Sequence, residues 1–312
     1  MKIRHKRYPK VERKYGSILG IKLSITNKER LLKDIELKLD SKEKFYIITP
    51  NPENLLIAKR DWLMRKAIDR CDFVIPDGIG LAAAYKFLEL DEFKGDSLRV
   101  FKIFWQGLFI GYKILTDKKY LTDSLPIIKG RELALDILKI ANDRHLNIYF
   151  FGGEYGESQR SIDKLKIVFP NINFKTNHQF SIYNNNCRPV SLRDRKIHKV
   201  VMGSIKMFEP HLIFVALSTP KQEKWIYRNL YRTKALGALA LGGTYNFMSG
   251  DAKIAPNWMS KHGLEWLFRL FTEPRKEQKI RRMKRIFTSV IIFPWKVFMW
   301  KLYPPKWEIS KK

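Results

Sequence analysis

The chain has 312 residues, a mass of 37.0 kDa, and 60 Lys and Arg against 31 Asp and Glu, which gives a formal net charge of +29. A hydrophobic content of 45% can bury a sizeable core, so wholesale disorder is not expected. The two cysteines, Cys71 and Cys187, supply neither a disulfide framework nor metal-ligand spacing, which favours a reducing, cytoplasmic compartment. The segment Lys2–Lys14 is basic and polar, so we expect no secretory signal. No apolar run approaches the about 20 residues of a spanning helix, so we expect no integral membrane protein.

From Phe45 onward the sequence alternates short apolar runs with helical stretches. Strands are predicted at residues 45–48, 73–75, 146–151, 173–175, 212–217 and 235–241, and helices at 52–70, 131–144, 158–169, 192–208 and 221–232, with one more helix that ends at Leu88. This alternation favours an α/β fold, a parallel sheet with helices on both faces.

Two segments stand outside this alternation. Residues 91–126 contain the aromatic run Phe101–Tyr112, which fits a lid, an acceptor groove or a membrane contact as well as a core helix at the edge of the sheet. From Asp251 onward the pattern becomes helical and basic. We therefore predict a basic N-terminal arm at 1–15, a catalytic core at 16–250 with an insertion at 91–126, and a membrane-associating appendage at 251–312.

The positive charge gathers at the two ends of the chain. Lys2–Lys14 carries 7 basic residues and 1 acidic residue, a net charge of +6, and Asp251–Lys312 carries 15 and 5, a net charge of +10. Such ends attract phosphate polymers and anionic lipids alike. The basic cluster at 275–285 is followed by apolar and aromatic residues interleaved with lysines, which favours a membrane surface. We expect one or two short interfacial helices broken by Pro294, Pro304 and Pro305, with packing on the protein's own core as the alternative.

Ligands of parallel α/β sheets bind beyond the carboxyl ends of the strands. The loops at these ends are residues 49–53, 76–80, 152–156, 218–222 and 242–246. Asp77 follows a strand, where its carboxylate is either a general base or a cap of the next helix. Two prolines stiffen the loop that presents Thr49 and Asn51, although Asn51 followed by Pro52 is also a good start for a helix.

Two further loops offer groups for a phosphate or a sugar. Gly152 and Gly153 follow a strand and open a helix, an arrangement that fits either a phosphate cradle or an ordinary tight turn. Lys221 and Gln222 offer a cation and an amide, or simply form a solvated helix start. The Asp-x-Asp pair that many nucleotide-sugar transferases use to hold a divalent metal is missing, as are zinc spacing and a P-loop. Metal-free transfer at a phosphate-bearing leaving group therefore fits the chain.

Taken in order, several strings resemble the WecG/TagA/CpsF family, glycosyltransferase family 26. The resemblance spans about Gly16 to Arg285, and its most specific piece is the run Ala255–Arg275. The other matching strings are Thr49-Pro-Asn-Pro-Glu53, Pro76-Asp-Gly-Ile-Gly80, Gly152-Gly153, Pro220-Lys-Gln-Glu-Lys-Trp225 and Gly242-Gly-Thr-Tyr-Asn-Phe247.

The resemblance implies a bacterial, inverting transferase with a Rossmann-like core that needs neither metal nor cofactor. Such an enzyme moves N-acetylmannosamine or another hexose or hexosamine from a UDP-sugar to an undecaprenyl-diphosphate-linked saccharide, in cell-surface polysaccharide biosynthesis. It implies a peripheral protein at the cytoplasmic face of the inner membrane, bound to an anionic surface, with a homo-oligomer as a further partner and no nucleic acid.

The family motifs also imply roles for particular residues. Asp77 becomes the candidate base that takes a proton from the acceptor hydroxyl. Thr49 and Asn51 line the sugar pocket, and Gln222 contacts substrate. Gly152, Gly153 and Lys221 join the substrate-binding set, and an appendage arginine meets the diphosphate. The arginine candidates are Arg275, Arg281 and Arg282.

The chain departs from the family pattern at several positions. Asn246 stands where Asp is frequent, Ser218 where Gly is usual, and Ile127 where Arg is common, with Arg131 as its potential replacement. These departures leave the donor and the acceptor open. Two alternatives come from other classes: a basic nucleic-acid-binding protein with a nucleotide-fold core, and an inactive membrane scaffold of the same fold.

Overall fold

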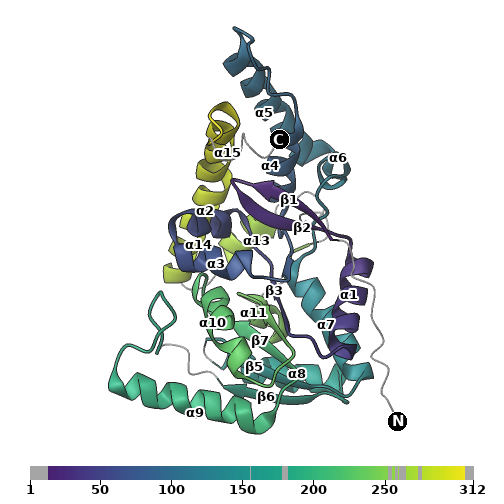
Figure 1. Cartoon of the computed structure of the whole chain (residues 1–312), viewed down its shortest axis with the longest axis vertical. Coiled ribbons are helices and arrows are strands. Elements are labelled where there is room, and N and C mark those ends of the chain that lie inside the picture. The colour runs from purple at the N-terminus through teal and green to yellow at the C-terminus, as the bar shows by residue number, and fades with distance from the viewer. Residues whose placement is uncertain are drawn as a thin grey trace, which may run out of the picture.

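The structure is a computed structural model that describes residues 13–154, 156–177, 182–251, 255–256, 259, 265–272 and 276–305. Its centre is a six-stranded parallel sheet in the order β4-β3-β8-β7-β5-β6 (Figure 1). The strands are β3 (Phe45–Ile48), β4 (Phe73–Val74), β5 (Asn147–Gly152), β6 (Asn173–Asn177), β7 (Leu212–Ala216) and β8 (Gly237–Ala240). The predicted α/β fold with a parallel sheet is confirmed.

Helices cover both faces of this sheet. Phe45 and Ile47 of β3 face one core, and Tyr46 and Ile48 face the other, because successive side chains of a strand point to opposite sides. The first core is closed by α1 (Lys28–Asp40), α7 (Gly130–Asp143), α8 (Glu157–Val168) and α11 (Thr244–Met248). The second is closed by α2 (Pro52–Arg60), α3 (Trp62–Asp69), α4 (Ile79–Glu89), α9 (Leu192–Phe208), and α10 (Lys221–Asn229) with its short continuation η1 (Leu230–Arg232).

The first elements of the chain are not among those predicted from sequence. An antiparallel hairpin of β1 (Lys14–Ile18) and β2 (Ile21–Ile25) precedes α1. The helix predicted at 52–70 is instead two helices, α2 and α3. Asp61 separates them, since its backbone is extended and its carboxylate accepts hydrogen bonds from Leu63 N (3.1 Å) and Met64 N (3.0 Å), the geometry of an N-cap.

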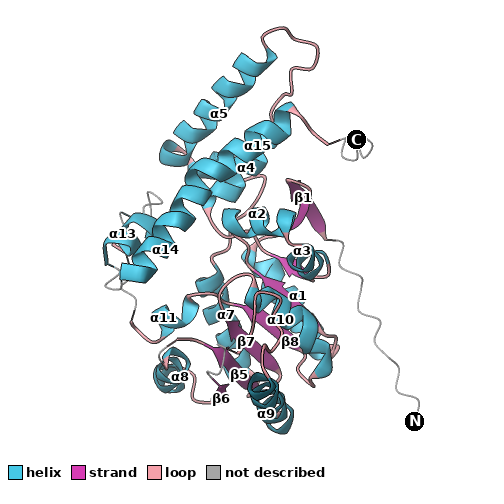
Figure 2. Ribbon diagram, turned by 90° about the vertical axis from the view of Figure 1, so that its left-hand side faces the viewer, coloured by secondary structure: helices cyan, strands magenta, loops and turns pink. Residues whose placement is uncertain are grey.

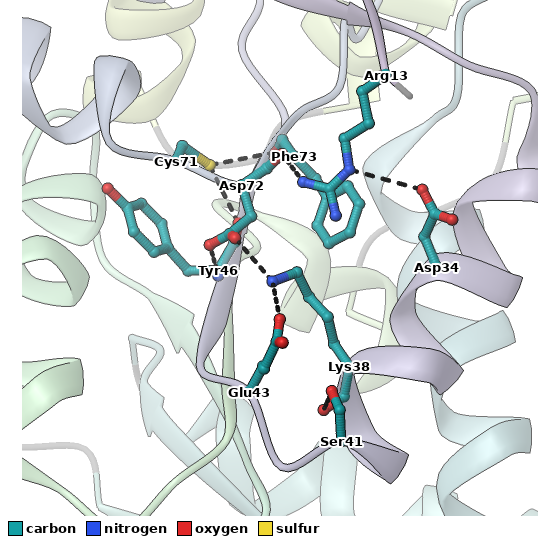
Figure 3. Close-up of polar contacts among 9 residues, drawn as sticks. All are labelled: Arg13, Asp34, Lys38, Ser41, Glu43, Tyr46, Cys71, Asp72 and Phe73. Carbon is teal, nitrogen blue, oxygen red and sulfur yellow. Dashed lines mark hydrogen bonds and ion pairs between the residues drawn. The ribbon is translucent and has the colours of Figure 1, made fainter. Parts of the chain in front are cut away.

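A polar cluster holds the amino ends of β3 and β4 (Figure 3). The Arg13 guanidinium lies 4.3 Å from the centre of the Phe73 ring and donates to Asp72 O at 3.2 Å. The Asp72 carboxylate pairs with Lys38 of α1 at 3.1 Å and accepts from Tyr46 N at 3.2 Å. These contacts attach the hairpin and α1 to the sheet at the edge opposite to the carboxyl ends of its strands.

The 91–126 segment forms α5 (Arg99–Thr116) and α6 (Lys118–Thr122). Helix α5 packs against α4, α6 and α15 (Phe293–Leu302), and it projects beyond the sheet beside α15 (Figure 2). Among the described residues, no helix has both the length and the apolarity needed to span a membrane.

The described part of the appendage is helical. After α13 (Glu265–Thr272), one uninterrupted helical run comprises α14 (Lys276–Phe287), the π-helical turn η2 (Thr288–Ile292) and α15. The expectation that Pro294 breaks this helix was wrong. The π-helical turn ends directly before Phe293, and its wider hydrogen-bonding pattern accommodates the proline ring and the missing N–H. Pro304 and Pro305 follow the end of α15.

Candidate active site

Five loops lie side by side at the carboxyl edge of the sheet. The strand order places the loops after β4, β3, β8, β7 and β5 next to one another. Hydrogen bonds link several of these neighbours: Asp77 N donates to Pro50 O (2.9 Å), Gly242 N donates to Gln222 Oε1 (2.8 Å), and Gly153 N donates to Ala216 O (2.9 Å). The motifs picked out in the sequence therefore meet along one edge.

Asp77 lies half-buried at the end of β4, beside the loop that carries Thr49. The next helix, α4, has Gly78 as its N-cap, so Asp77 does not occupy the capping position. Gly78 has a φ of +100°, a backbone conformation that glycine adopts readily. The carboxylate of Asp77 is thus presented by a tight turn at the rim of the sheet.

Thr49 faces the amino end of α7. A Cβ atom placed on Gly130, the first residue of α7, would lie 2.8 Å from Thr49 Oγ1. Ile128 N donates to Pro76 O (3.3 Å), so the start of α7 also lies against the Asp77 loop. One residue further on, the Arg131 guanidinium lies 5.1 Å from the centre of the Phe247 ring in α11. The segment 128–131 therefore adds a third side to the site.

Asn51 is the N-cap of α2. Its Oδ1 accepts a hydrogen bond from Asn54 N at 3.1 Å, and Pro52 follows at the start of the helix. This is the capping role that the sequence offered as its alternative. This hydrogen bond engages the side-chain oxygen of Asn51, not its NH₂ group.

Gly152 and Gly153 are needed for close packing at the end of β5. A Cβ on Gly152 would lie 2.4 Å from Ala216 O, and one on Gly153 would lie 2.9 Å from Tyr245 Cδ2. Both residues have positive φ, +93° and +85°. The first turn of the following helix, α8, contains the carboxylate of Glu157, and its Oε2 accepts a hydrogen bond from Glu154 N at 3.2 Å.

Gln222 is buried between the ends of β7 and β8. Its Oε1 accepts from Gly242 N, and its Nε2 donates to Glu223 Oε1 at 3.0 Å. Lys221 behaves differently, since its Nζ donates to Tyr183 O at 2.9 Å and so holds the segment before α9. Gln222 therefore lies at the carboxyl edge of the sheet, whereas the ammonium of Lys221 is engaged by Tyr183 O.

Glu223 is a buried acid that the sequence analysis did not assign. Its side chain is fully buried, and its Oε1 accepts from Asn54 Nδ2 (3.3 Å), Thr219 Oγ1 (3.1 Å) and Gln222 Nε2 (3.0 Å). Its Oε2 has no hydrogen-bond partner among the described residues. Burial raises the pKa of the Glu223 carboxyl. Burial therefore favours the neutral form of this carboxyl more than exposure to water would. The only sequence signal was its place in the Pro220–Trp225 string.

The appendage reaches the site through α14. Arg285 Nε donates to Glu53 Oε2 at 2.7 Å, next to the loop that carries Thr49 and Asn51. On the same helix Arg281 is exposed and Arg282 is half-buried, while Arg275 lies outside the described residues. Arg285 was part of the basic cluster in the sequence, but no pattern distinguished it from its neighbours.

The fold and the arrangement of these loops define an α/β protein with a Rossmann-like sheet, whose carboxyl edge is where ligands of such sheets bind. The chain belongs to the Glycosyl transferase WecG/TagA/CpsF family, which it matches over residues 16–100 and 110–306. It is a glycosyltransferase. The unmatched stretch lies within α5.

Two relatives carry the same name, N-acetylglucosaminyldiphosphoundecaprenol N-acetyl-beta-D-mannosaminyltransferase. The one from Bacillus spizizenii is 24% identical over 253 residues, which cover 81% of each chain. The one from Staphylococcus aureus is 24% identical over 296 residues, which cover 94% of each chain.

Proposed function

We propose that this chain is an inverting, metal-independent glycosyltransferase of cell-surface polysaccharide biosynthesis. It moves a sugar from a UDP-sugar to a saccharide linked to undecaprenyl diphosphate. One observation carries this proposal: the loops of the family motifs gather at one sheet edge, where the Asp77 loop is hydrogen-bonded to the Thr49 loop. The names of the two relatives support N-acetylmannosamine as the donor sugar and a lipid-linked N-acetylglucosamine as the acceptor. The departures at Ser218 and Asn246 extend the donor candidates to other hexoses and hexosamines.

In this proposal Asp77 is the general base. Its carboxylate accepts the proton of the acceptor hydroxyl while that oxygen attacks C1 of the donor sugar. The bond from C1 to the UDP oxygen breaks on the opposite face, so the configuration at C1 inverts and UDP leaves with the bonding electrons. Thr49, Asn51 and Gln222 hold the sugar in this orientation. Glu223 holds Gln222 by accepting its Nε2 hydrogen bond.

Negative charge grows on the departing UDP and needs fixed positive groups nearby. Arg275, Arg281 and Arg282 supply cations from the appendage, and the backbone at Gly152 and Gly153 gives the diphosphate a close approach. The ammonium of Lys221 also adds positive charge, while it donates a hydrogen bond to Tyr183 O. In this scheme the cations take the place of a divalent metal.

We further propose that the protein is peripheral at the cytoplasmic face of the bacterial inner membrane, where its acceptor lies. The formal net charge of +29 supports attraction to an anionic surface. A homo-oligomer is part of the same proposal, and nucleic acid is not a partner.

The test is product formation by the full chain. A panel of UDP-sugars is incubated with a short-chain polyprenyl-diphosphate-GlcNAc acceptor in the presence of EDTA, and the lipid product is identified by mass spectrometry and its anomeric configuration by NMR. We expect one donor to yield an acceptor-dependent product of inverted configuration at a rate that EDTA does not change. A retained configuration, or turnover that EDTA abolishes, contradicts the mechanism. Vesicle binding with no product from any donor would favour the inactive scaffold, and salt-sensitive nucleic-acid binding without product would favour the other alternative.

A further inference from the structure

Helix α5 presents its polar side chains to the protein and its apolar side chains to the outside. Arg99 donates from Nη1 to Leu302 O (3.0 Å) and from Nη2 to Lys301 O (3.1 Å). Gln106 Nε2 donates to Asp91 O at 3.2 Å, and Lys113 pairs with Asp117 at 3.0 Å. A helix on the surface of a water-soluble protein has the reverse arrangement, with its apolar stripe toward the core.

The exposed positions of α5 hold no charged residue, and the partly exposed Lys102 pairs with Asp96. Only Ile103 and Ile110 of this helix are buried, while Trp105 is 55% exposed and Tyr112 is 61% exposed. The exposed positions of α5 hold Val100, Phe101, Phe104, Trp105, Leu108, Phe109, Gly111, Tyr112, Leu115 and Thr116. A contiguous aromatic surface of this kind marks a site of contact with an apolar partner.

This orientation of α5 is fixed by a buried lysine. Lys301 of α15 is 3% exposed, and its Nζ donates to Phe87 O (2.5 Å), Leu90 O (3.0 Å) and Gln106 Oε1 (2.9 Å). These bonds join α15, the end of α4 and the inner face of α5. A rotation of α5 about its axis that hid the aromatic side chains would break the contact from Gln106 and leave the lysine ammonium less satisfied. The aromatic face therefore points outward as part of the folded structure.

The neighbouring helical run carries the same combination of residues. Phe287, Val290, Ile291 and Trp295 are exposed along α14, η2 and the start of α15. Figure 2 shows α5 and α15 lying side by side at one end of the molecule. Lysines accompany both helices, with Lys119 exposed on α6 directly after α5 and Lys296 exposed beside Trp295.

We propose that α5 lies in the headgroup region of an anionic bilayer with its aromatic face toward the acyl chains. Trp and Tyr favour this zone, and lysine stems reach from it to the headgroups. A second copy is a poorer occupant of this particular face, because Lys119 and Lys296 beside it complement anionic headgroups and would meet like charges in a second copy. The proposed homo-oligomer uses another face. The proposal rests on the proposed function, in which the acceptor carries a lipid tail. Residues 101–109 of this face lie outside the match to the family.

The test measures binding of the full chain to vesicles of phosphatidylethanolamine and phosphatidylglycerol. The variant is Phe104→Glu with Leu108→Glu, and the control is Ile167→Glu, which places the same charge on an apolar residue of α8 that is 83% exposed. We expect the double variant to lose at least about tenfold in vesicle affinity and the control to lose little. Transfer to a soluble short-chain acceptor should be unchanged in both, which separates failure of this inference from failure of the proposed function.

A second measurement follows the depth of the helix. Lipids brominated on their acyl chains should quench less fluorescence in Trp105→Phe than in wild type, because one inserted tryptophan has been removed. Equal vesicle binding by the double variant and wild type, or equal quenching of Trp105→Phe and wild type, overturns the proposal. A wild-type dimer that the double variant dissociates without losing vesicle affinity would assign the face to a second copy instead.

Discussion

At the residue scale, Glu223 is a buried group that fixes the orientation of its neighbour, the buried Gln222 amide. Its carboxyl joins the first turn of α2, through Asn54, to the first turn of α10, through Gln222. An ionised carboxylate with a buried, unpartnered oxygen such as Oε2 is costly in such a place, which is why burial raises the pKa of Glu223. Gln222 then keeps its Oε1 for Gly242 N and stays in one orientation.

The raised pKa of Glu223 predicts a dependence of stability on pH. The native state holds the proton more tightly than the unfolded chain, so the native state loses stability as the pH rises above the ordinary glutamate value of 4.5, and the loss levels off above the native pKa. Glu223→Gln keeps the neutral shape and has no proton to lose. We expect the variant to match wild type near pH 4.5 and to have the higher free energy of unfolding once the native acid of wild type ionises at higher pH.

Urea unfolding between about pH 4.5 and 8 measures this difference. Glu29→Gln, a change at an exposed glutamate of α1, is the control and should run parallel to wild type. Parallel curves for Glu223→Gln and wild type would show that Glu223 is not held neutral.

Some residue roles could be predicted and others could not. The Asn51–Pro52 pair identified a helix start because that preference is local, and the structure has Asn51 as the cap. Glu223 is enclosed in part by Asn54, which lies 169 positions away in the chain. The burial of Glu223 therefore could not be predicted from the residues next to it in the sequence. Asp77 could be placed at the rim because a carboxylate directly after a buried strand has only one edge of the sheet to occupy.

At the scale of elements, the contact between α14 and α2 attaches the appendage to the site. The Arg285–Glu53 pair is 55% and 24% exposed in its two side chains, and exposed pairs contribute only about 0–1 kcal/mol to stability. The expected role of this ion pair is geometric, because it holds α14, which carries Arg281 and Arg282, beside the Thr49–Glu53 loop.

We therefore predict that Arg285→Glu lowers kcat/KM by about tenfold, equivalent to about 1.4 kcal/mol in the transition state, while the free energy of unfolding falls by less than about 1 kcal/mol. The control is Arg144→Glu, which breaks a similar pair between α7 and Asp40 of α1 at 2.6 Å. Equal loss of kcat/KM in both variants, or no loss in Arg285→Glu, would contradict the role given to α14. The double variant Glu53→Arg with Arg285→Glu should recover part of the loss.

Strands were easier to predict than the direction that a helix faces. All the parallel strands except the edge strand β6 are buried on both sides and so stand out as short apolar runs, such as Leu212–Ala216. The hairpin at the start of the chain was missed because its strands contain Lys and Ser and are only 5 residues each. For α5 the periodicity gave an apolar stripe, but periodicity cannot tell whether a stripe faces a core or a lipid. The prediction that Pro294 breaks the helix was wrong for a related reason, since the π-helical turn that precedes the proline has no sequence signature.

At the scale of the whole molecule, the helical run from Lys276 to Leu302 connects the rim of the site to the aromatic surface of α5. It is roughly 40 Å long at the rise of an α-helix. Arg285 near one end contacts Glu53, and Lys301 near the other end contacts Gln106 of α5. In the proposed arrangement this helical run holds both the catalytic edge and the lipid-binding surface, so that a lipid-linked sugar reaches Asp77 while its tail stays in the bilayer.

The most direct test of this account is the acceptor-dependent release of UDP by Asp77→Asn compared with wild type. Asp163→Asn, at an exposed aspartate of α8, is the matched control. We predict that Asp77→Asn lowers kcat at least about 100-fold, with little change in the KM for the donor, because loss of a general base removes a factor of about 10²–10⁴. The control should keep its full rate. A kcat for Asp77→Asn within a few-fold of wild type would contradict the assignment of Asp77 as the base.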